Sequence, residues 1–160
     1  MEKEKQMTTE VRKIENAEEK QRICRAILEA LPEWFGIPQA REEYVSGSAD
    51  KRFFAAMDGE NPVGFLYLKE TGRDTVELYV MGVLKARHRT GAGRALVEAA
   101  KQAAREAGYA FMQVKTVQMG KYAEYDATNR FYLAMGFREF EVFPHLWDEW
   151  NPCQVYVMGL

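Results

Sequence analysis

The sequence has no long apolar segment and no surplus of charge of either sign. No apolar run approaches the roughly 20 residues needed to cross a bilayer, so no membrane span is predicted. The 160 residues carry a formal net charge of −2. We therefore expect neither nucleic acid nor an anionic membrane surface as a partner.

Cysteine and histidine are scarce. Cys24 and Cys153 form no Cys-x-x-Cys pair, and neither lies in a cysteine-nucleophile motif. The two histidines, His88 and His145, have no metal-ligand spacing to each other or to the cysteines, so no metal is predicted. Isolated cysteines and the absence of an apolar signal-peptide core in "MEKEKQMTTE" lead us to expect a cytoplasmic protein without a disulfide.

The length suits one domain with a single core. We expect residues 1–7 to form a mobile, charged leader and residues 8–160 to form the domain. Apolar periodicity predicts an α+β domain with the element order βααβββαβαββ. The predicted strands are 8–14, two within 52–70, 74–84, 111–119, 138–143 and 153–159, and the predicted helices are 17–31, 39–45, 91–107 and 127–135.

A glycine-bearing junction, "RHRTGAG" at 87–93, joins a predicted strand to the longest predicted helix. Glycines let the backbone approach a ligand closely, and the first helical turn has unpaired N–H groups and partial positive charge. With His88, Arg89 and Arg94 as additional donors, the junction suits a diphosphate. The alternative is a tight turn whose basic side chains are simply solvated.

Two common phosphate motifs are excluded at this junction. The Walker loop requires Gly-x-x-x-x-Gly-Lys-Ser/Thr, which is absent, and a dinucleotide fingerprint would need glycine where Leu96 stands. The remaining spacing, in "VLKARHRTGAGRAL", resembles the acetyl-CoA signature Arg/Gln-x-x-Gly-x-Gly/Ala of the GCN5-related N-acetyltransferase (GNAT) family. The stretch "ATNRFYLAMGF" resembles that family's second signature, through Asn129, Tyr132 and Gly136.

The resemblance implies a single-domain GNAT-like fold, with a central mixed, mostly antiparallel sheet of about seven strands flanked by helices. It also implies acetyl-CoA as co-substrate. The backbone of the junction would hold the CoA pyrophosphate, groups near Met81 and Val83 would hold the thioester and pantetheine arm, and Asn129 would bind the same arm or a phosphate. The implied junction residues are His88, Arg89, Thr90, Gly91, Ala92, Gly93 and Arg94. Histidine at 88 departs from the usual arginine or glutamine.

The resemblance also implies catalytic groups. Glu77 lies eleven positions before His88, where the histone-acetylating branch of the family has its general base, and Tyr132 would protonate the departing thiolate. An alkylamine must lose a proton before it attacks a thioester, so such a base is chemically useful. Glu77 could instead be a solvated or ion-paired strand residue, and Tyr132 a core aromatic. Gly82, inside the same strand, indicates a bulge or a close backbone approach.

The acceptor is expected to be an amine of a small molecule or peptide. In the family, the regions containing Trp34, Phe35 and Trp147 usually shape the acceptor pocket, and aromatic walls suit a cationic amine. The alternative is that these rings pack the core. Many relatives are dimers, so a homodimer is one expected state. A non-catalytic acyl-CoA-binding or sensing module is the alternative to an N-acetyltransferase.

Overall fold

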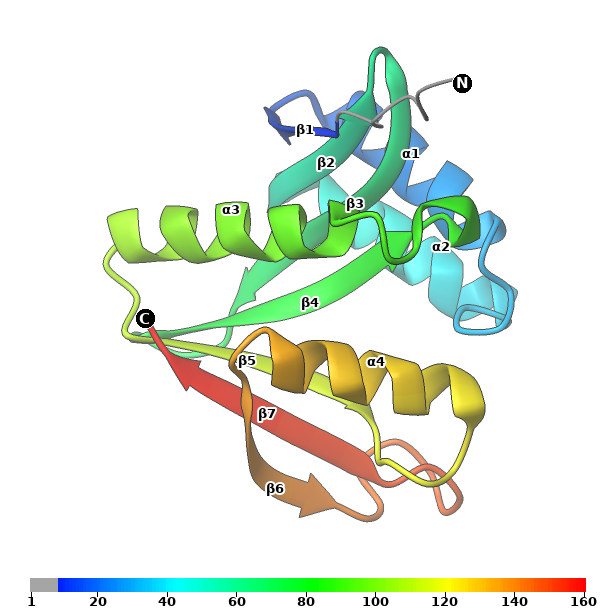
Figure 1. Ribbon diagram of the computed structural model, residues 1–160, viewed down its shortest axis with the longest axis vertical. Helices are drawn as coiled ribbons and strands as arrows, with labels where there is room; N and C mark the ends of the chain where they lie inside the picture. Colours follow the sequence, from blue (N-terminus) through cyan, green and yellow to red (C-terminus); the bar gives the residue numbers. More distant parts are fainter. Residues whose placement is uncertain (1–8) are drawn as a thin grey trace, which may run out of the picture.

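Residues 9–160 are described by a computed structural model, in which one seven-stranded sheet lies between helices (Figure 1). The predicted element order is confirmed, while the expected leader at residues 1–7 lies outside the described residues. The strands are β1 (Glu10–Ile14), β2 (Arg52–Asp58), β3 (Asn61–Glu70), β4 (Thr75–Val83), β5 (Phe111–Val117), β6 (Arg138–Phe143) and β7 (Cys153–Gly159). The α-helices are α1 (Ala17–Glu29), α2 (Pro38–Gly47), α3 (Ala92–Glu106) and α4 (Ala123–Ala134).

The sheet has the strand order β1-β2-β3-β4-β5-β7-β6. All neighbouring strands are antiparallel except β4 and β5, which are parallel because α3 returns the chain to the starting edge between them. The predicted mixed, mostly antiparallel sheet is therefore confirmed.

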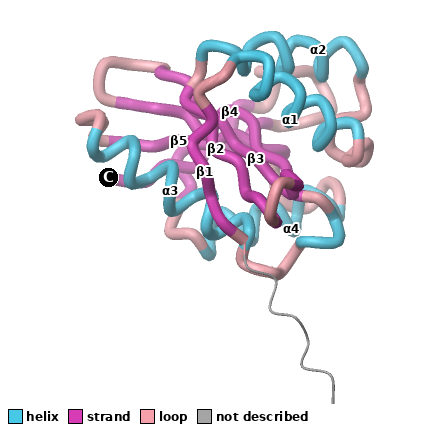
Figure 2. The backbone as a smooth tube through the Cα atoms, turned by 90° about the horizontal axis from the view of Figure 1, so that it is seen from above, coloured by secondary structure: helices cyan, strands magenta, loops and turns pink. Residues whose placement is uncertain are grey.

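Each face of the sheet buries its own apolar cluster. On one face, α1 and α2 cover side chains such as Phe53, Phe65 and Tyr67. On the other, α3 and α4 cover the alternate residues of β3, Leu66 and Leu68. Figure 2 shows the two pairs of helices on opposite sides of the strands. Any group on the sheet can therefore be assigned to the α1/α2 face or to the α3/α4 face.

Two helix starts differ in how well local sequence predicts them. Asn16 caps α1, a role typical of asparagine just before a helix, because its Oδ1 accepts the N–H of Glu19 at 2.8 Å. The helix α4, in contrast, begins at Ala123, four residues before the predicted range. Asp126 lies inside its first turns and accepts the N–H of Gly120 at 2.7 Å. This carboxylate closes the preceding loop.

The bulge in β4 is at Tyr79 and not at Gly82. Leu78 pairs with Leu68 and Val80 with Tyr67, so Tyr79 is the extra residue. Gly82 is regularly paired, but a Cβ added there would lie 3.1 Å from side-chain atoms of Ile27 and Leu31. The glycine thus permits the close approach of α1, which is the other role that the sequence left open.

Candidate active site

A gap in the sheet lies between β4 and β5. The two strands pair from Thr75 with Phe111 to Leu78 with Val114, yet β4 continues to Val83 and β5 to Val117. Figure 1 shows them diverging beyond the paired segment, towards the edge with the α1–α2, β5–α4 and β6–β7 loops. The unpaired edge of β4 is therefore open to a ligand that can hydrogen-bond to a strand.

The peptide groups that face this gap can be identified from the β3–β4 register. Leu84 donates its N–H to the carbonyl of Val63 on the β3 side. Because the peptide groups of successive strand residues point to opposite edges, those of Gly82 also face β3, and those of Met81 and Val83 face the gap. The peptide groups of Met81 and the N–H of Val83 are thus turned towards the gap, where the Val83 carbonyl contacts His88 Nε2.

The glycine turn lies where the chain passes from the end of β4 into α3. Gly91 has φ 91°, in the left-handed region, and an added Cβ would contact nothing within 4 Å. Arg89 is also left-handed, with φ 65°, and Thr90 donates its hydroxyl to the carbonyl of Arg87 at 2.6 Å. No side chain among residues 9–160 caps α3, so within this range the N–H groups of its first turn have no side-chain partner. Such consecutive N–H groups form an anion-binding concavity.

Two basic side chains border the turn. Arg89 and Arg94 are exposed, and no carboxylate within residues 9–160 forms an ion pair with either. Ala92, in contrast, is fully buried against the core, so only its backbone is turned towards the ligand side. Gly93 allows α4 to pack closely against the start of α3, because an added Cβ would lie 3.2 Å from the ring of Phe131.

His88 is engaged with the protein. Its Nε2 lies 2.7 Å from the carbonyl oxygen of Val83, and its ring packs edge-on against Trp34 at 5.8 Å between centroids. Since a carbonyl only accepts, Nε2 carries the proton and is not available to a phosphate. His88 therefore links the glycine turn to the end of β4 and to the α1–α2 loop.

Glu77 lies at the closed end of the gap, on the α1/α2 face. Its side chain is 4% exposed, and Lys115 of β5 brings its Nζ to 2.8 Å from Oε1. The contact lacks hydrogen-bond alignment, and Oε1 accepts no hydrogen bond from residues 9–160. Glu77 is thus buried and ion-paired with Lys115.

Tyr132 lies on the opposite face of the sheet from Glu77. It packs against Phe137 and Tyr156 in the core beneath α4. Burial raises the pKa of Tyr132 above the usual range for tyrosine. The residue is therefore protonated at neutral pH, although its ring is also part of the core.

Asn129 is fully buried and all its polar atoms are used within the protein. Its Nδ2 donates to the carbonyls of Val117 and Tyr125 at 2.8 and 2.7 Å, and its Oδ1 accepts the hydroxyl of Tyr156 at 2.6 Å. The side chain links α4 to the end of β5 at Val117 and to the Tyr156 side chain in the middle of β7. Asn129 thus serves the packing of α4 in this structure, and it has no atom at the surface.

The three aromatic residues expected around the acceptor are not brought together. Trp34 joins the α1–α2 loop to α4, because its Nε1 donates to the carbonyl of Glu124 at 3.4 Å and its carbonyl accepts the hydroxyl of Tyr125 at 3.1 Å. Phe35 packs edge-on against Tyr44. Trp147 lies half exposed in the β6–β7 loop and has no ring contact with either.

An ion pair that the sequence analysis missed supports the glycine turn. Arg87 contacts Asp58 at the β2–β3 turn, and its guanidinium is largely buried. Arg87 and Asp58 are 29 residues apart, so no local sequence pattern predicts the ion pair. The ion pair holds Arg87 in place, and the carbonyl of Arg87 in turn accepts the hydroxyl of Thr90. The two contacts together fix the backbone around the left-handed Arg89.

Neither cysteine is suited to nucleophilic attack. Both are buried, and burial raises the pKa of Cys153 to about 11 and that of Cys24 to about 12. A thiol with such a pKa is almost entirely protonated at neutral pH. The expectation that no intermediate forms on cysteine is consistent with these values.

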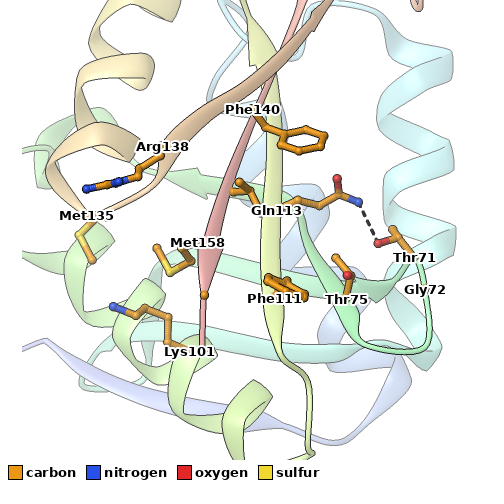
Figure 3. Close-up of a pocket in the computed structure, with 13 residues that line it drawn as sticks. Thr71, Gly72, Thr75, Lys101, Phe111, Gln113, Met135, Arg138, Phe140 and Met158 are labelled. Carbon is orange, nitrogen blue, oxygen red and sulfur yellow. Dashed lines mark hydrogen bonds between the residues drawn. The ribbon is translucent and has the colours of Figure 1, made fainter.

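A groove of about 710 Å³ lies at the other end of β5, away from the gap. Its walls include the exposed rings of Phe111 and Phe140. Figure 3 shows Gln113 in this groove, donating to the hydroxyl of Thr71 at 2.8 Å. None of the residues predicted for catalysis or cofactor binding lines it. We therefore place the candidate site at the gap, where free peptide groups and the glycine turn meet.

Within residues 9–160, no group of histidine, cysteine, aspartate or glutamate is arranged to hold a metal ion. No helix in the same range is long and apolar enough to cross a membrane.

Comparison with known proteins identifies a family. The sequence model described as an acetyltransferase (GNAT) domain matches residues 49–139, which contain Glu77, the glycine turn and Tyr132. A comparison with curated proteins gives no match.

Solved structures share the fold. A protein from Desulfovibrio desulfuricans described as an acetyltransferase of the GNAT family has a TM-score of 0.79 at 20% identity, covering 95% of this chain and 99% of that one. The ribosomal-protein-S18-alanine N-acetyltransferase of Escherichia coli has a TM-score of 0.75 at 16% sequence identity, and the match covers 95% of this chain and 94% of that one. An aminoglycoside 6'-N-acetyltransferase complexed with coenzyme A has a TM-score of 0.72 at 16% sequence identity, and the match covers 94% of this chain and 96% of that one. At these identities the similarity shows the fold alone.

The contacts of Asn129 predict a structural role that can be measured. Asn129→Ala should lower the free energy of unfolding by about 3 kcal/mol, because it leaves the Tyr156 hydroxyl and the Val117 carbonyl without their partner. Urea titration would measure this. Gln102→Ala, which removes one exposed bond to Glu106, is the control and should cost under about 0.5 kcal/mol. Equal stability of the two variants would contradict the pinning role.

Proposed function

Since the chain belongs to the GNAT family of acetyltransferases, we propose that it moves an acetyl group from acetyl-CoA directly to a primary amine of a small molecule or peptide. The observation that carries the proposal is the position of the glycine turn. The free N–H groups of the turn lie at the start of α3, beside the unpaired edge of β4. A CoA molecule whose pyrophosphate binds at the turn can therefore extend its pantetheine arm into the gap.

Two sets of backbone groups would bind the donor. The N–H groups of residues 91–94, with the side chains of Arg89 and Arg94, would hold the pyrophosphate. The peptide groups of Met81 and the N–H of Val83, whose carbonyl His88 already contacts, would bond the pantetheine arm in the manner of an added strand, and an exposed N–H there would stabilise the oxyanion. A structural neighbour complexed with coenzyme A supports this class of donor.

Glu77 and Tyr132 would act from opposite faces of the sheet on a ligand threaded through the gap. Glu77 would take the proton that the amine loses as it attacks the thioester. Tyr132 would protonate the leaving thiolate. Burial that raises the pKa of Tyr132 keeps it protonated, and the same apolar surroundings would raise the pKa of the thiolate, so the transfer remains feasible.

The acceptor would approach from the α1/α2 face, because Glu77 lies there. The α1–α2 loop with Trp34 and Phe35 borders that side, and Trp147 lies on another loop at the same edge of the sheet (Figure 1). Aromatic rings favour a cationic acceptor. The printed names of two neighbours, an aminoglycoside N-acetyltransferase and a ribosomal-protein-alanine N-acetyltransferase, support amines of both small molecules and proteins as the class to test.

The experiment that tests the function is an acceptor screen. Purified protein is mixed with acetyl-CoA and aminoglycosides, polyamines, amino acids or peptides, and the release of CoA thiol is measured. Release that depends on one amine, with the acetylated amine identified by mass, supports the proposal. Tight CoA binding without release for any amine would instead favour a non-catalytic binding module.

Gly91 offers a test of the donor site with a close control. Gly91→Glu should weaken CoA binding at least about 100-fold, because it places a negative charge and bulk at the N-terminus of α3. Gly108→Glu has the same φ of 91° and equally open space at the other end of α3, so it controls for backbone strain. Isothermal titration with CoA measures both variants. Equal affinities would remove the turn from the site.

Tyr132→Phe tests the proton donor. The hydroxyl of Tyr132 makes no hydrogen bond within residues 9–160, so phenylalanine should preserve the packing with Phe137 and Tyr156. We expect kcat to fall by about 100-fold with an unchanged KM for acetyl-CoA. Tyr109→Phe, which removes an exposed bond to Glu70, should leave kcat unaltered. A wild-type kcat in Tyr132→Phe would make Tyr132 a packing residue only.

A further inference from the structure

The side chain of Lys115 lies beside Glu77, the residue that would deprotonate the acceptor amine in the proposed mechanism. Lys115 is the first residue of β5 beyond the last pair with β4, Leu78 with Val114. Leu78 and Val114 pack on the α3/α4 face, so Glu77 and Lys115 both lie on the α1/α2 face. The ion pair therefore stands at the closed end of the gap, on the side from which an acceptor would approach.

The surroundings of Glu77 leave it one amine partner. Lys115 Nζ is 2.8 Å from its Oε1. Gln113, the register partner of Glu77 on β5, turns its amide to Thr71 instead. Lys69, the register partner on β3, places its Nζ 4.7 Å from the centre of the Tyr79 ring. Lys115 is 31% exposed and Glu77 only 4%, so the lysine side chain reaches solvent while the carboxylate is buried.

Lys115 Nζ lies 2.8 Å from the carboxylate that the proposed mechanism uses as its base. Among residues 9–160 Lys115 is the only amine that pairs with Glu77, so it is placed to be deprotonated when no acceptor amine is bound. Resting on the proposed function, we infer that Lys115 is a self-acetylation site of this protein, modified when acetyl-CoA is bound and no acceptor amine fills the site.

The step balances with acetyl-CoA as the sole co-reactant. A proton leaves Lys115 Nζ for Glu77, and the nitrogen lone pair forms a bond to the acetyl carbonyl carbon. The nitrogen, positively charged after the attack, loses its second proton to water as the carbon–sulfur bond breaks. The electron pair of that bond leaves with the sulfur, and the thiolate takes a proton from water or from Tyr132, which water then reprotonates. The products are acetyl-Lys115 and CoA. The amide carries no charge, so Glu77 loses its ion-pair partner in the described part of the chain.

The test follows an isotopically labelled acetyl group from acetyl-CoA into the full-length protein, in a buffer without primary amines. Peptide mapping by mass spectrometry gives the rate at each lysine. Lys69 is the internal control, because it is exposed, lies on the same face and adjoins Glu77 on the other strand. We expect Lys115 to be labelled at least about tenfold faster than Lys69. Equal rates would mean uncatalysed acetylation and would overturn the inference.

Two further measurements make the result specific. A saturating acceptor amine should slow labelling of wild-type Lys115 at least about tenfold by occupying the same position, and Glu77→Gln should slow it similarly. Labelling that neither change affects contradicts the inference. Lys69→Arg should leave the rate at Lys115 unchanged.

The acceptor screen separates the two levels of the proposal. Acetyl transfer to an external amine with unlabelled Lys115 overturns the self-acetylation alone. Absence of both transfer and labelling overturns the proposed function, and the self-acetylation with it.

Discussion

The parallel pairing of β4 and β5 stops after Leu78 and Val114, and the site depends on that interruption. The helix α3 makes the two strands parallel by returning the chain to the starting edge of the sheet. Beyond the last pair, the peptide groups of Met81 and the N–H of Val83 face a gap instead of a strand, while His88 binds the Val83 carbonyl. Because unpaired backbone groups inside a protein are costly, this edge is suited to a ligand that supplies the missing partners.

The surrounding contacts preserve the gap and divide its functions between two faces. Asn129 holds α4 on β5 and β7, and Arg87 with Asp58 holds the backbone that leads into the glycine turn. On the α1/α2 face, Glu77 and Lys115 form the polar end of the gap. Tyr132 lies on the α3/α4 face, so groups suited to proton transfer flank the gap from both sides.

Features with a local signal could be predicted from the sequence, and features set by register or distant contacts could not. The element order follows from apolar periodicity, and the glycine turn from residues adjacent in sequence. The bulge falls at Tyr79 because the β3–β4 register decides it, and the helix α4 begins before Asp126 because that carboxylate bonds to Gly120. Sequence spacing placed Asn129 and His88 near the site, but only the fold shows that their polar groups bond to the protein.

Amide hydrogen exchange with and without CoA tests the central claim most directly, namely that the gap beside the glycine turn binds the donor. If it does, CoA should slow exchange at residues 91–95 and at Met81 and Val83, while Gly108, at the other end of α3, should not change. Slowing confined to Phe111, Gln113 and their neighbours around the groove, with the turn unaffected, would contradict the claim.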